Sequence, residues 1–551
     1  MKLSLKPPMV ILFILLYSLV FLLPFSGSVH LFDWDEIIFA EAAREMNITG
    51  DFLTVTINYA PFWEKPPGFI WLQALSMKLF GINEFAARFP NLLCGFLTLL
   101  SLYLAGRKVQ GERFGMLWAL SYGTAILPFF YFRTGIIDPW FNLLIFQGFS
   151  FFIFYLHSTG PRKKHLHAGL SAFFLGLAVL TKGPVAVLIF GLSFLVYLVM
   201  VRGRIGARLS HVLLFTGVLL LTGGSWFLVA ILKGHMQVVQ DFISYQAGLF
   251  SDDFAGHGGF PGFHFVVLLF GAFPASIFMF GDFTRKREEQ LLPRMFKSWM
   301  VILLTLVLIL FSLVQTKLVH YSSLAWYPVT FLAARAISRW MDRQNGIFRW
   351  QRIVLMSMGL FFGVIMLVIP LLARNTGALA EGLPAGRDPF VKGILQSAAG
   401  WSVADLLPGV IMLAGSVYAV VRIGRRDLWG VFALSLVTLL FTYSSMLLFV
   451  PKVEKMIQRP AITFMKQHAG PGDRVIALGF RSFAPAFYGE WMPGDLPAGL
   501  RQDAHQLSRE LRPLYVVMKA GRADKYFHLY PELERIGQEG GFVFGVFPER
   551  N

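Results

Sequence analysis

The residues whose types and spacing are best suited to chemistry lie in one acidic stretch near the N-terminus. Asp35 and Glu36 are adjacent, and Glu64 and Lys65 come directly before two prolines, whose rings stiffen the backbone. Eight of the 32 acidic residues of the chain fall between residues 26 and 88. A carboxylate near a bilayer is costly unless it is paired, hydrated or functional. We therefore interpret residues 26–88 as the catalytic loop of a membrane enzyme.

Long apolar runs on both sides of this loop predict membrane spans. The chain has 551 residues, is 56% hydrophobic and 15% charged, and contains 57 phenylalanines. Runs of about 20 apolar residues have the length of a helix that crosses a bilayer. The sequence predicts a polytopic α-helical membrane protein with about thirteen transmembrane helices, of which the first is an uncleaved N-terminal span. The expected spans are 9–25, 89–106, 113–131, 138–156, 166–181, 184–201, 209–232, 263–281, 298–315, 319–337, 351–373, 405–423 and 428–450.

The basic residues predict how these helices are oriented. The net charge is +17, but the basic residues are divided among the loops between spans and do not form one surface. With the N-terminus in the cytoplasm, every basic cluster lies on the cytoplasmic face, as the positive-inside rule requires. The excess charge therefore reflects topology and attraction to anionic lipid, and no nucleic-acid partner is expected. The clusters are residues 107–108, 162–164, 202–208, 285–287, 335–352 and 422–426.

The segments outside the spans are expected to lie on the opposite, periplasmic face. In the catalytic loop, residues 35–46 follow an amphipathic helical pattern, and residues 69–80 are typical of an interfacial helix. Residues 451–551 contain no run of membrane length but contain strand-like segments near 474–478, 513–518 and 541–547. We therefore expect a transmembrane domain over 1–450 and a soluble, periplasmic C-terminal α/β domain over 451–551. The single cysteine, Cys94, excludes a disulfide framework.

Several ordered motifs resemble one known family of membrane enzymes. Asp35-Glu36 is followed by residues 40–46 of sequence AEAAREM and then by Glu64-Lys65-Pro66-Pro67. The order and separation of these motifs resemble the ArnT-like membrane glycosyltransferases of the GT-C fold, which are related to protein O-mannosyltransferases. The resemblance covers roughly residues 9–340. The further matching motifs are residues 71–72, 80–88, Asp138, 180–184, 225–227 and 316–321.

The resemblance implies a function as well as a fold. It implies a sugar donor carried on undecaprenyl phosphate or another polyprenyl phosphate, transfer on the periplasmic side of a bacterial inner membrane, and inversion at the anomeric carbon. In the ArnT branch of the family the sugar is aminoarabinose and the acceptor is a lipid A phosphate. Here Ile37, Ile38 and Phe39 stand where that branch has Thr-Arg-Tyr, and Phe62-Trp63 replaces a tyrosine-like position. The identity of the sugar is therefore open.

Three carboxylates are candidate catalytic residues: Asp35, Glu36 and Asp138. Asp35 is the candidate base or acceptor-positioning group, because a carboxylate can take part of a hydroxyl proton in a transition state. If the acceptor is itself a phosphate, no base is required, and Asp35 would position the acceptor or balance charge. The simpler alternative for Asp35 is a helix cap, and for Asp138 a favourable interaction with a helix dipole.

Four residues are candidate ligands of the donor phosphate: Lys65, Lys317, Tyr321 and Arg133. An ammonium group binds phosphate as a point charge, and the two prolines after Lys65 would hold it in place. The alternative is that these side chains anchor the protein at the membrane interface, where lysine and tyrosine are common. Lys182, in a Thr-Lys-Gly-Pro turn, is interpreted as architectural.

A divalent metal ion is the one candidate cofactor. Glu64 and His257 lie in two loops of the same face and could bind it together. Two ligands are fewer than the three or four of a usual zinc site.

The expected function is transfer of a sugar from a polyprenyl-phosphate donor, with lipid A, another glycan or lipid, or a protein hydroxyl as the acceptor. A protein O-glycosyltransferase is the nearest alternative. A lipid-linked sugar transporter or flippase is the alternative from another class, and it predicts inverted repeats with ionisable groups near the membrane midplane. The sequence shows no internal repeat, and its carboxylates gather in an outer loop.

Overall fold

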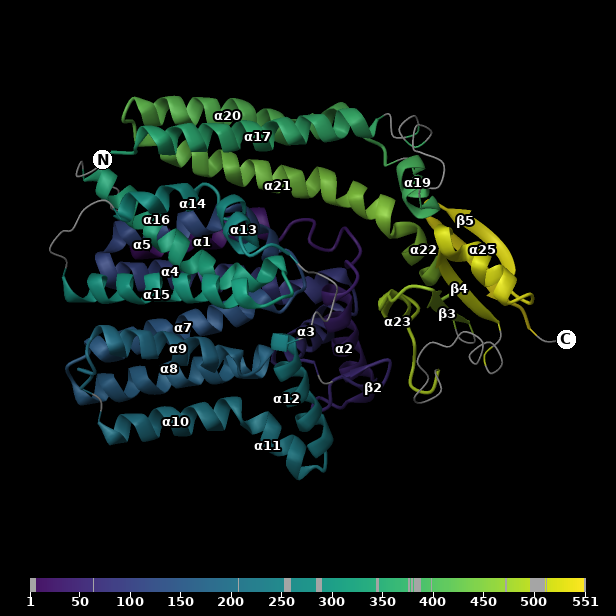
Figure 1. The fold of residues 1–551 in the computed structure, drawn as a ribbon, viewed down its shortest axis with the longest axis horizontal. Helices are drawn as coiled ribbons and strands as arrows, with labels where there is room; N and C mark the ends of the chain where they lie inside the picture. Colours follow the sequence, from purple (N-terminus) through teal and green to yellow (C-terminus); the bar gives the residue numbers. More distant parts are fainter. Residues whose placement is uncertain are drawn as a thin grey trace.

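The computed structural model describes residues 6–549 except 63, 207, 252–258, 284–289, 343–345, 375–376, 378–379, 381–387, 398, 471–472, 496–510 and 512. Most of these residues form helices that lie side by side in one bundle, and a small α/β unit stands at one end of it (Figure 1). The helices of the bundle, with the short connecting turns left out, are α1 (Pro7–Tyr17), α4 (Glu84–Gln110), α5 (Glu112–Gly123), α6 (Ile126–Tyr131), α7 (Asp138–His157), α8 (Pro161–Lys182), α9 (Val185–Met200), α10 (Leu209–Gly223), α11 (Ser225–Leu232), α12 (Met236–Ser251), α13 (Phe263–Gly271), α14 (Ala275–Phe278), α15 (Leu291–Leu313), α16 (Trp326–Met341), α17 (Arg349–Ala373), α20 (Leu407–Gly424) and α21 (Trp429–Ile457).

Many of these helices have the length and composition of membrane spans. Among the described residues, seven helices are long and apolar enough to cross a membrane, or up to nine if each of two bent pairs is one span. The bent pairs are α10 with α11, at 53°, and α13 with the helical segment Ala275–Phe283, at 109°. The second bend falls at Pro274, which cannot continue a helix without losing a hydrogen bond. The expected polytopic helical class is confirmed, and the count of thirteen stays a prediction.

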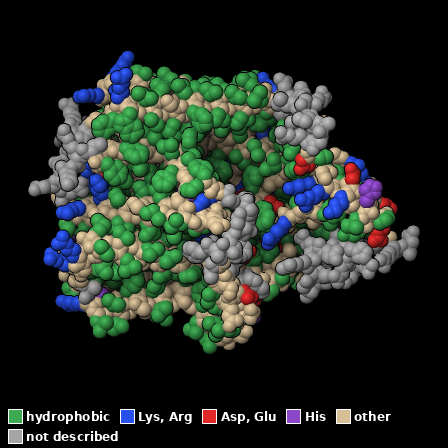
Figure 2. Space-filling model, viewed as in Figure 1, with side chains coloured by type: hydrophobic (Ala, Val, Ile, Leu, Met, Phe, Trp, Pro, Cys, Tyr) green, Lys and Arg blue, Asp and Glu red, His purple; other side chains and the backbone are tan. Residues whose placement is uncertain are grey.

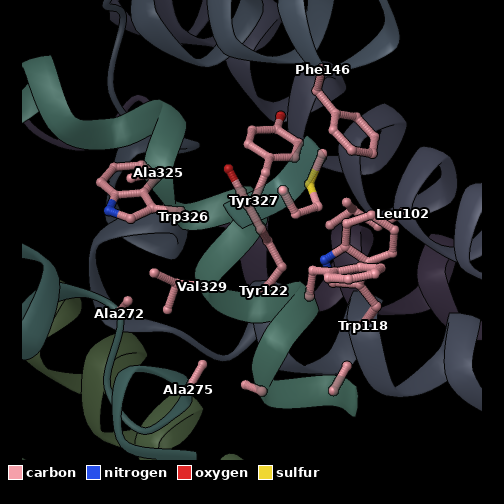
Figure 3. Close-up of a cluster of buried hydrophobic side chains, with 14 of the residues drawn as sticks. Leu102, Trp118, Tyr122, Phe146, Ala272, Ala275, Ala325, Trp326, Tyr327 and Val329 are labelled. Carbon is pink, nitrogen blue, oxygen red and sulfur yellow. The ribbon is translucent and has the colours of Figure 1, made fainter. Parts of the chain in front are cut away.

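Aromatic packing holds the centre of the bundle together. Tyr327 of α16 stacks on Phe146 of α7 with ring centroids 4.6 Å apart and lies 4.9 Å from Tyr122 of α5. Trp118 of α5 meets Phe146 edge to face at 5.5 Å, and its indole N–H donates to Thr330 (Figure 3). Each such aromatic pair contributes about 1 kcal/mol beyond the burial of its surface. These contacts fix α5, α7 and α16 relative to one another, and α7 begins at Asp138.

The acidic loop folds against one end of the bundle. It contains α2 (Asp35–Thr49), a hairpin of two short strands, β1 (Thr56–Ile57) and β2 (Ala60–Pro61), and then α3 (Gly68–Phe80). The two helices agree with the expected segments 35–46 and 69–80, and α2 ends at Gly50, whose positive φ of 73° stops the helix. A Cβ atom at Gly68 would lie 2.6 Å from the carbonyl oxygen of Leu180. Glycine at this position therefore lets the start of α3 approach the last turn of α8.

The C-terminal residues form a four-stranded sheet with helices around it. Its strands lie in the order β3 (Arg474–Leu478), β4 (Leu514–Lys519), β6 (Phe542–Phe547) and β5 (Glu534–Glu539), with β3 parallel to β4 and the other pairs antiparallel. Helices α22 (Arg459–Gln467), α23 (Ala484–Tyr488) and α25 (Ala520–Leu529) belong to this unit, and α19 (Pro389–Gln396) packs on it from the α17–α20 connection (Figure 1). Strand β5 was not expected, because its polar sequence ERIGQE has no strand-like pattern.

Charge is distributed unevenly along the bundle. Lys and Arg side chains lie along the end of the molecule farthest from the C-terminal unit, while apolar side chains cover most of the flank between the two ends (Figure 2). This arrangement is the one that the positive-inside rule predicts for a bundle with its basic end in the cytoplasm.

Candidate active site

A cavity of about 210 Å³ lies where the acidic loop meets the bundle. The start of α2, the start of α7, the last turn of α8 and the turn before α16 each supply polar side chains to it. Its charged and hydrogen-bonding lining consists of Asp35, Glu64, Lys65, Asp138, Asn142, Lys182, Gln246, His320 and Tyr321, and the remaining lining residues are apolar. Residues separated by almost 290 positions in the sequence are therefore brought into one site.

The two aspartates of the cavity are each the first residue of a helix. Asp35 begins α2 and Asp138 begins α7, where the helix dipole favours a negative charge. The Asp138 side chain is almost fully buried, and its Oδ1 atom accepts a hydrogen bond of 2.6 Å from the ammonium group of Lys182. Its Oδ2 atom has no hydrogen-bond partner among the described residues. A buried carboxylate oxygen without a partner is costly, so it suits a donor that a substrate supplies.

The cations of the cavity lie close to these carboxylates. Burial holds the pKa of Lys65 below its ordinary value, with Glu64 opposing that shift and Lys182 adding to it. His320 also lines the cavity, from the turn before α16, and offers an imidazole for hydrogen bonding there. The two lysines are the groups of this cavity best suited to hold a phosphate.

Tyr321 presents a hydroxyl to the same cavity. A phenol can both donate and accept a hydrogen bond, so Tyr321 can serve a substrate in either way. The ammonium group of Lys182 lies 5.8 Å from the centre of the Tyr321 ring.

Glu36 lies outside this cavity, although it is adjacent to Asp35. Its carboxylate accepts two hydrogen bonds of 2.9 Å from Arg88 of α4, and others from the backbone N–H groups of Phe32 and Gly135. Burial alone would raise the pKa of Glu36, but the Arg88 guanidinium and these N–H groups hold it below its ordinary value. In this arrangement Glu36 fastens the start of α2 to α4 and to the turn that precedes Asp138.

Two of the four expected phosphate ligands also have structural partners elsewhere. Arg133 donates to the carbonyl oxygens of Phe21 and Pro24, at 2.6 and 2.7 Å. The ammonium group of Lys317 donates to carbonyl oxygens in the last turn of α15, including that of Ser312 at 2.7 Å. Neither residue lines the cavity that holds Lys65 and Tyr321.

The proposed metal ligands are only partly described. Glu64 lines the cavity, whereas His257 lies outside the described residues. Within the described ranges, no three His, Cys, Asp or Glu side chains come close enough together to bind a metal ion. A metal site therefore stays a prediction, and no chemical step below depends on it.

Sequence reasoning did not assign Lys182 and His320 to the site. Lys182 was interpreted as part of a turn, yet it forms the ion pair with Asp138. His320 lies within the 316–321 motif, between the residues that were chosen. Both residues lie in segments that carry the family resemblance, Lys182 in residues 180–184 and His320 in residues 316–321, and these segments could have indicated them.

The architecture matches solved structures over almost its whole length. The crystal structure of ArnT from Cupriavidus metallidurans bound to undecaprenyl phosphate superposes with a TM-score of 0.78 at 19% sequence identity, and the match covers 99% of this chain and 100% of that one. The apo crystal structure of the same protein gives a TM-score of 0.74. The chain is thus a multi-pass membrane protein with the GT-C fold.

Sequence comparisons agree with this class. The family model described as dolichyl-phosphate-mannose-protein mannosyltransferase matches residues 64–226. An undecaprenyl phosphate-alpha-4-amino-4-deoxy-L-arabinose arabinosyl transferase of Pectobacterium carotovorum is 26% identical over 430 residues, which cover 76% of this chain and 72% of the relative. An uncharacterised protein of Aquifex aeolicus is 31% identical over 51% of this chain, and the match covers 62% of that protein, less than two thirds of its length. In sequence and in fold, the chain is therefore similar to ArnT.

Proposed function

We propose that this protein is a glycosyltransferase that moves a sugar from a polyprenyl-phosphate donor to an acceptor at the periplasmic face of a bacterial inner membrane. The observation that carries the proposal is the single cavity that joins Asp35 and Asp138 with Lys65 and Lys182. The ArnT structure that this chain resembles binds undecaprenyl phosphate, and the Pectobacterium relative is named for a sugar donor on the same lipid.

The cavity provides the groups that such a transfer needs. An acceptor oxygen attacks the anomeric carbon as the bond from that carbon to the phosphate oxygen breaks, so the polyprenyl phosphate leaves with the bonding electron pair. One displacement inverts the anomeric centre. Lys65 and Lys182 stabilise the charge that develops on the leaving phosphate. Asp35 receives the proton of a hydroxyl acceptor, or positions a phosphate acceptor, which has no proton to give.

The orientation of the chain follows from the same proposal. The N-terminus and the basic loops lie in the cytoplasm, and the acidic loop and the C-terminal α/β unit lie in the periplasm. The division is a transmembrane domain over residues 1–450 and a periplasmic domain over 451–551. The polyprenyl tail reaches the cavity from the bilayer, because apolar side chains such as Phe141 and Phe311 continue its lining.

Transfer to protein hydroxyl groups is a second candidate. The matching family model, over residues 64–226, carries the description of a protein mannosyltransferase. The two candidates share the donor and the cavity and differ in the acceptor.

Mass spectrometry of lipid A, surface glycans and envelope proteins tests both candidates. We would compare cells with the gene, cells without it, and cells that carry Asp35→Asn. We expect one fraction to lose a sugar-sized mass without the gene, and Asp35→Asn to reduce that product about 100-fold or more. Asp51→Asn is the matched control, because Asp51 lies in the same loop outside the cavity and its side chain accepts hydrogen bonds from its near neighbours Leu53 and Thr54. Unchanged fractions, with the protein present in the membrane, would favour lipid transport.

A further inference from the structure

A second polar cavity lies on the C-terminal unit, away from the membrane bundle. Its volume is about 690 Å³. The first turn of α19, the first turn of α25 and the segment after β3 form its walls. Arg481, Lys519 and Arg522 supply its positive charge, and we call this cavity the basic groove. Nothing in the proposed donor site involves these residues.

The positive charge of the basic groove is largely uncompensated. Among the described residues of its lining, Asp388 is the only carboxylate, and it already accepts the backbone N–H of Phe390 as the cap of α19. Among the described residues, Arg481, Lys519 and Arg522 form no ion pair within 4.0 Å with a carboxylate. Arg522 instead donates to the carbonyl oxygen of Gly479. Three cations without carboxylate partners form a ready binding place for an anion.

Aromatic rings hold two of these cations in place. The ammonium group of Lys519 lies 4.8 Å from the centre of the Phe390 ring and 5.3 Å from that of Phe480. The Arg481 guanidinium lies 5.1 Å from the ring of Trp34. A cation–π contact orients a cation but does not neutralise it, so the charges stay available to a ligand.

Two helix N-termini add to the same field. Asp388 caps α19, and Lys519 occupies the cap position of α25 without a side-chain hydrogen bond to the helix. The positive end of each helix dipole thus lies at the basic groove, together with the three side-chain cations.

The dipeptide Trp34-Asp35 has one residue in contact with the basic groove and the other in the lining of the donor cavity. Trp34, which contacts Arg481, directly precedes Asp35, which lines the donor cavity. Trp34 is 48% exposed and has a positive φ of 76°, a backbone conformation that a bulky residue rarely adopts. Asp33 completes the connection, because its carboxylate accepts the backbone N–H of Phe483 at 3.1 Å. Figure 2 shows basic side chains on the C-terminal unit on the side that faces the bundle.

We propose that the basic groove binds the anionic headgroup of the acceptor glycolipid, a saccharide that carries phosphate or carboxylate groups, while the donor occupies the cavity beside Asp35. The inference rests on the proposed function, since it identifies the class of acceptor. A headgroup held by Arg481 and Lys519 would lie beside Trp34, the residue that directly precedes Asp35. An uncharged acceptor would gain nothing from this arrangement of cations.

Binding of the purified full-length protein to a defined lipid tests this inference. We would measure the affinity of the protein, in neutral phosphatidylcholine nanodiscs and without donor, for bisphosphorylated lipid A and for dephosphorylated lipid A. We expect the double variant Arg481→Glu/Lys519→Glu to bind the bisphosphorylated form at least about tenfold more weakly, since a hydrogen bond to a charged group is worth about that factor or more. Lys525→Glu, an exposed charge change on the same helix α25 outside the groove, should bind as the wild type does.

The other outcomes would overturn the inference. If the double variant keeps full affinity, or if the wild type binds both forms of lipid A equally, the groove does not bind an anionic headgroup. Phosphatidylglycerol that competes as well as bisphosphorylated lipid A would make the groove a general membrane anchor instead. If the double variant does not fold, the single variant Lys519→Gln tests the inference instead. We expect its affinity for bisphosphorylated lipid A to be about threefold lower than that of the wild type. The binding assay contains no donor, so it tests the groove separately from transfer. A protein that binds the headgroup in this assay but transfers no sugar in cells would contradict the proposed function and not the binding site.

Discussion

Lys182 binds one carboxylate oxygen of Asp138 and leaves the other oxygen without a partner among the described residues. Two roles of Lys182 follow from this contact. It holds Asp138 in the orientation in which Oδ2 is available to substrate, and it adds a positive charge beside Lys65. A lysine that served only to end helix α8 would need no such partner.

We therefore expect Lys182→Met to lower the rate of transfer about 100-fold, because the substitution leaves a buried carboxylate without its partner. Lys182→Arg should restore part of the rate, since it keeps the charge. The double variant Lys182→Met/Asp138→Asn should be no slower than the slower single variant, because the two residues act as a unit. Steady-state kinetics on protein in nanodiscs measures these rates, with Lys233→Met as an exposed control. A double variant whose losses multiply would show that the residues act independently.

The sequence predicts some residues of the candidate site and misses others. Asp35, Lys65 and Tyr321 could be selected because their motifs stand at family-like separations. Arg133 and Lys317 could equally be selected, because a cation near a helix end can bind either a ligand or backbone carbonyl groups, and the sequence does not distinguish the two. The ion pair of Lys182 depends on the end of α8 meeting the start of α7, which no local pattern encodes.

Helix α2 connects the donor cavity to the C-terminal unit. Its first residue lines the cavity, and Arg44, two turns later, donates to the carbonyl oxygen of Trp491 at 2.6 Å. Arg44 also binds Glu41 through two hydrogen bonds of 2.7 Å. Glu45 lies beside this pair and is fully buried. The sequence predicted an amphipathic helix over residues 35–46, but it could not predict that the C-terminal unit covers the side of the helix that carries Arg44.

This burial makes the stability of α2 depend on pH. Burial, with Glu41 nearby, raises the pKa of Glu45 from 4.5 to about 8. Below pH 4.5 the carboxyl is protonated in both the folded and the unfolded chain, and its contribution to stability is fully present. Between pH 4.5 and 8 only the folded chain holds the proton, so the free energy of unfolding decreases as pH rises.

We expect the midpoint of thermal unfolding to fall by roughly 5 °C from pH 5 to pH 9 through this group. Glu45→Gln, which is neutral at every pH, should remove most of that decrease. Scanning fluorimetry of the detergent-solubilised protein measures it. Glu534→Gln, on the exposed face of β5, should leave the pH dependence unchanged. A wild-type midpoint that is constant from pH 5 to pH 9 would contradict the assigned protonation of Glu45.

Elements at the edges of the fold were the least predictable. Strand β5 pairs with β6 although five of its six residues are exposed, because an edge strand obtains its backbone hydrogen bonds from one neighbour and needs no apolar face. The apolar segment 263–281 has the composition of a single span, yet it folds as two helices bent by 109°. Composition determines that such a segment is buried in the membrane or the bundle, and tertiary packing determines its path.

The two ends of the helical bundle differ in the charged residues that they carry. Basic side chains line the end of the bundle that lies far from the C-terminal unit (Figure 2), and the acidic loop, with helices α2 and α3, folds against the other end (Figure 1). In the orientation proposed above, the bilayer separates a transfer reaction at the acidic end from the cytoplasm. This separation requires one fixed orientation of the chain.

Cysteine labelling tests that orientation directly. The native Cys94 is fully buried, so it gives little background with a membrane-impermeant maleimide. In intact spheroplasts we expect the reagent to label Lys525→Cys on α25 and to leave Arg162→Cys, at the start of α8, unlabelled. In inverted membrane vesicles the two results should exchange, because the basic end then faces the reagent. Labelling of Arg162→Cys alone in spheroplasts would place the cavity on the cytoplasmic side and remove the basis for a periplasmic acceptor. Equal labelling of both positions in one sealed preparation would contradict a single orientation of the chain.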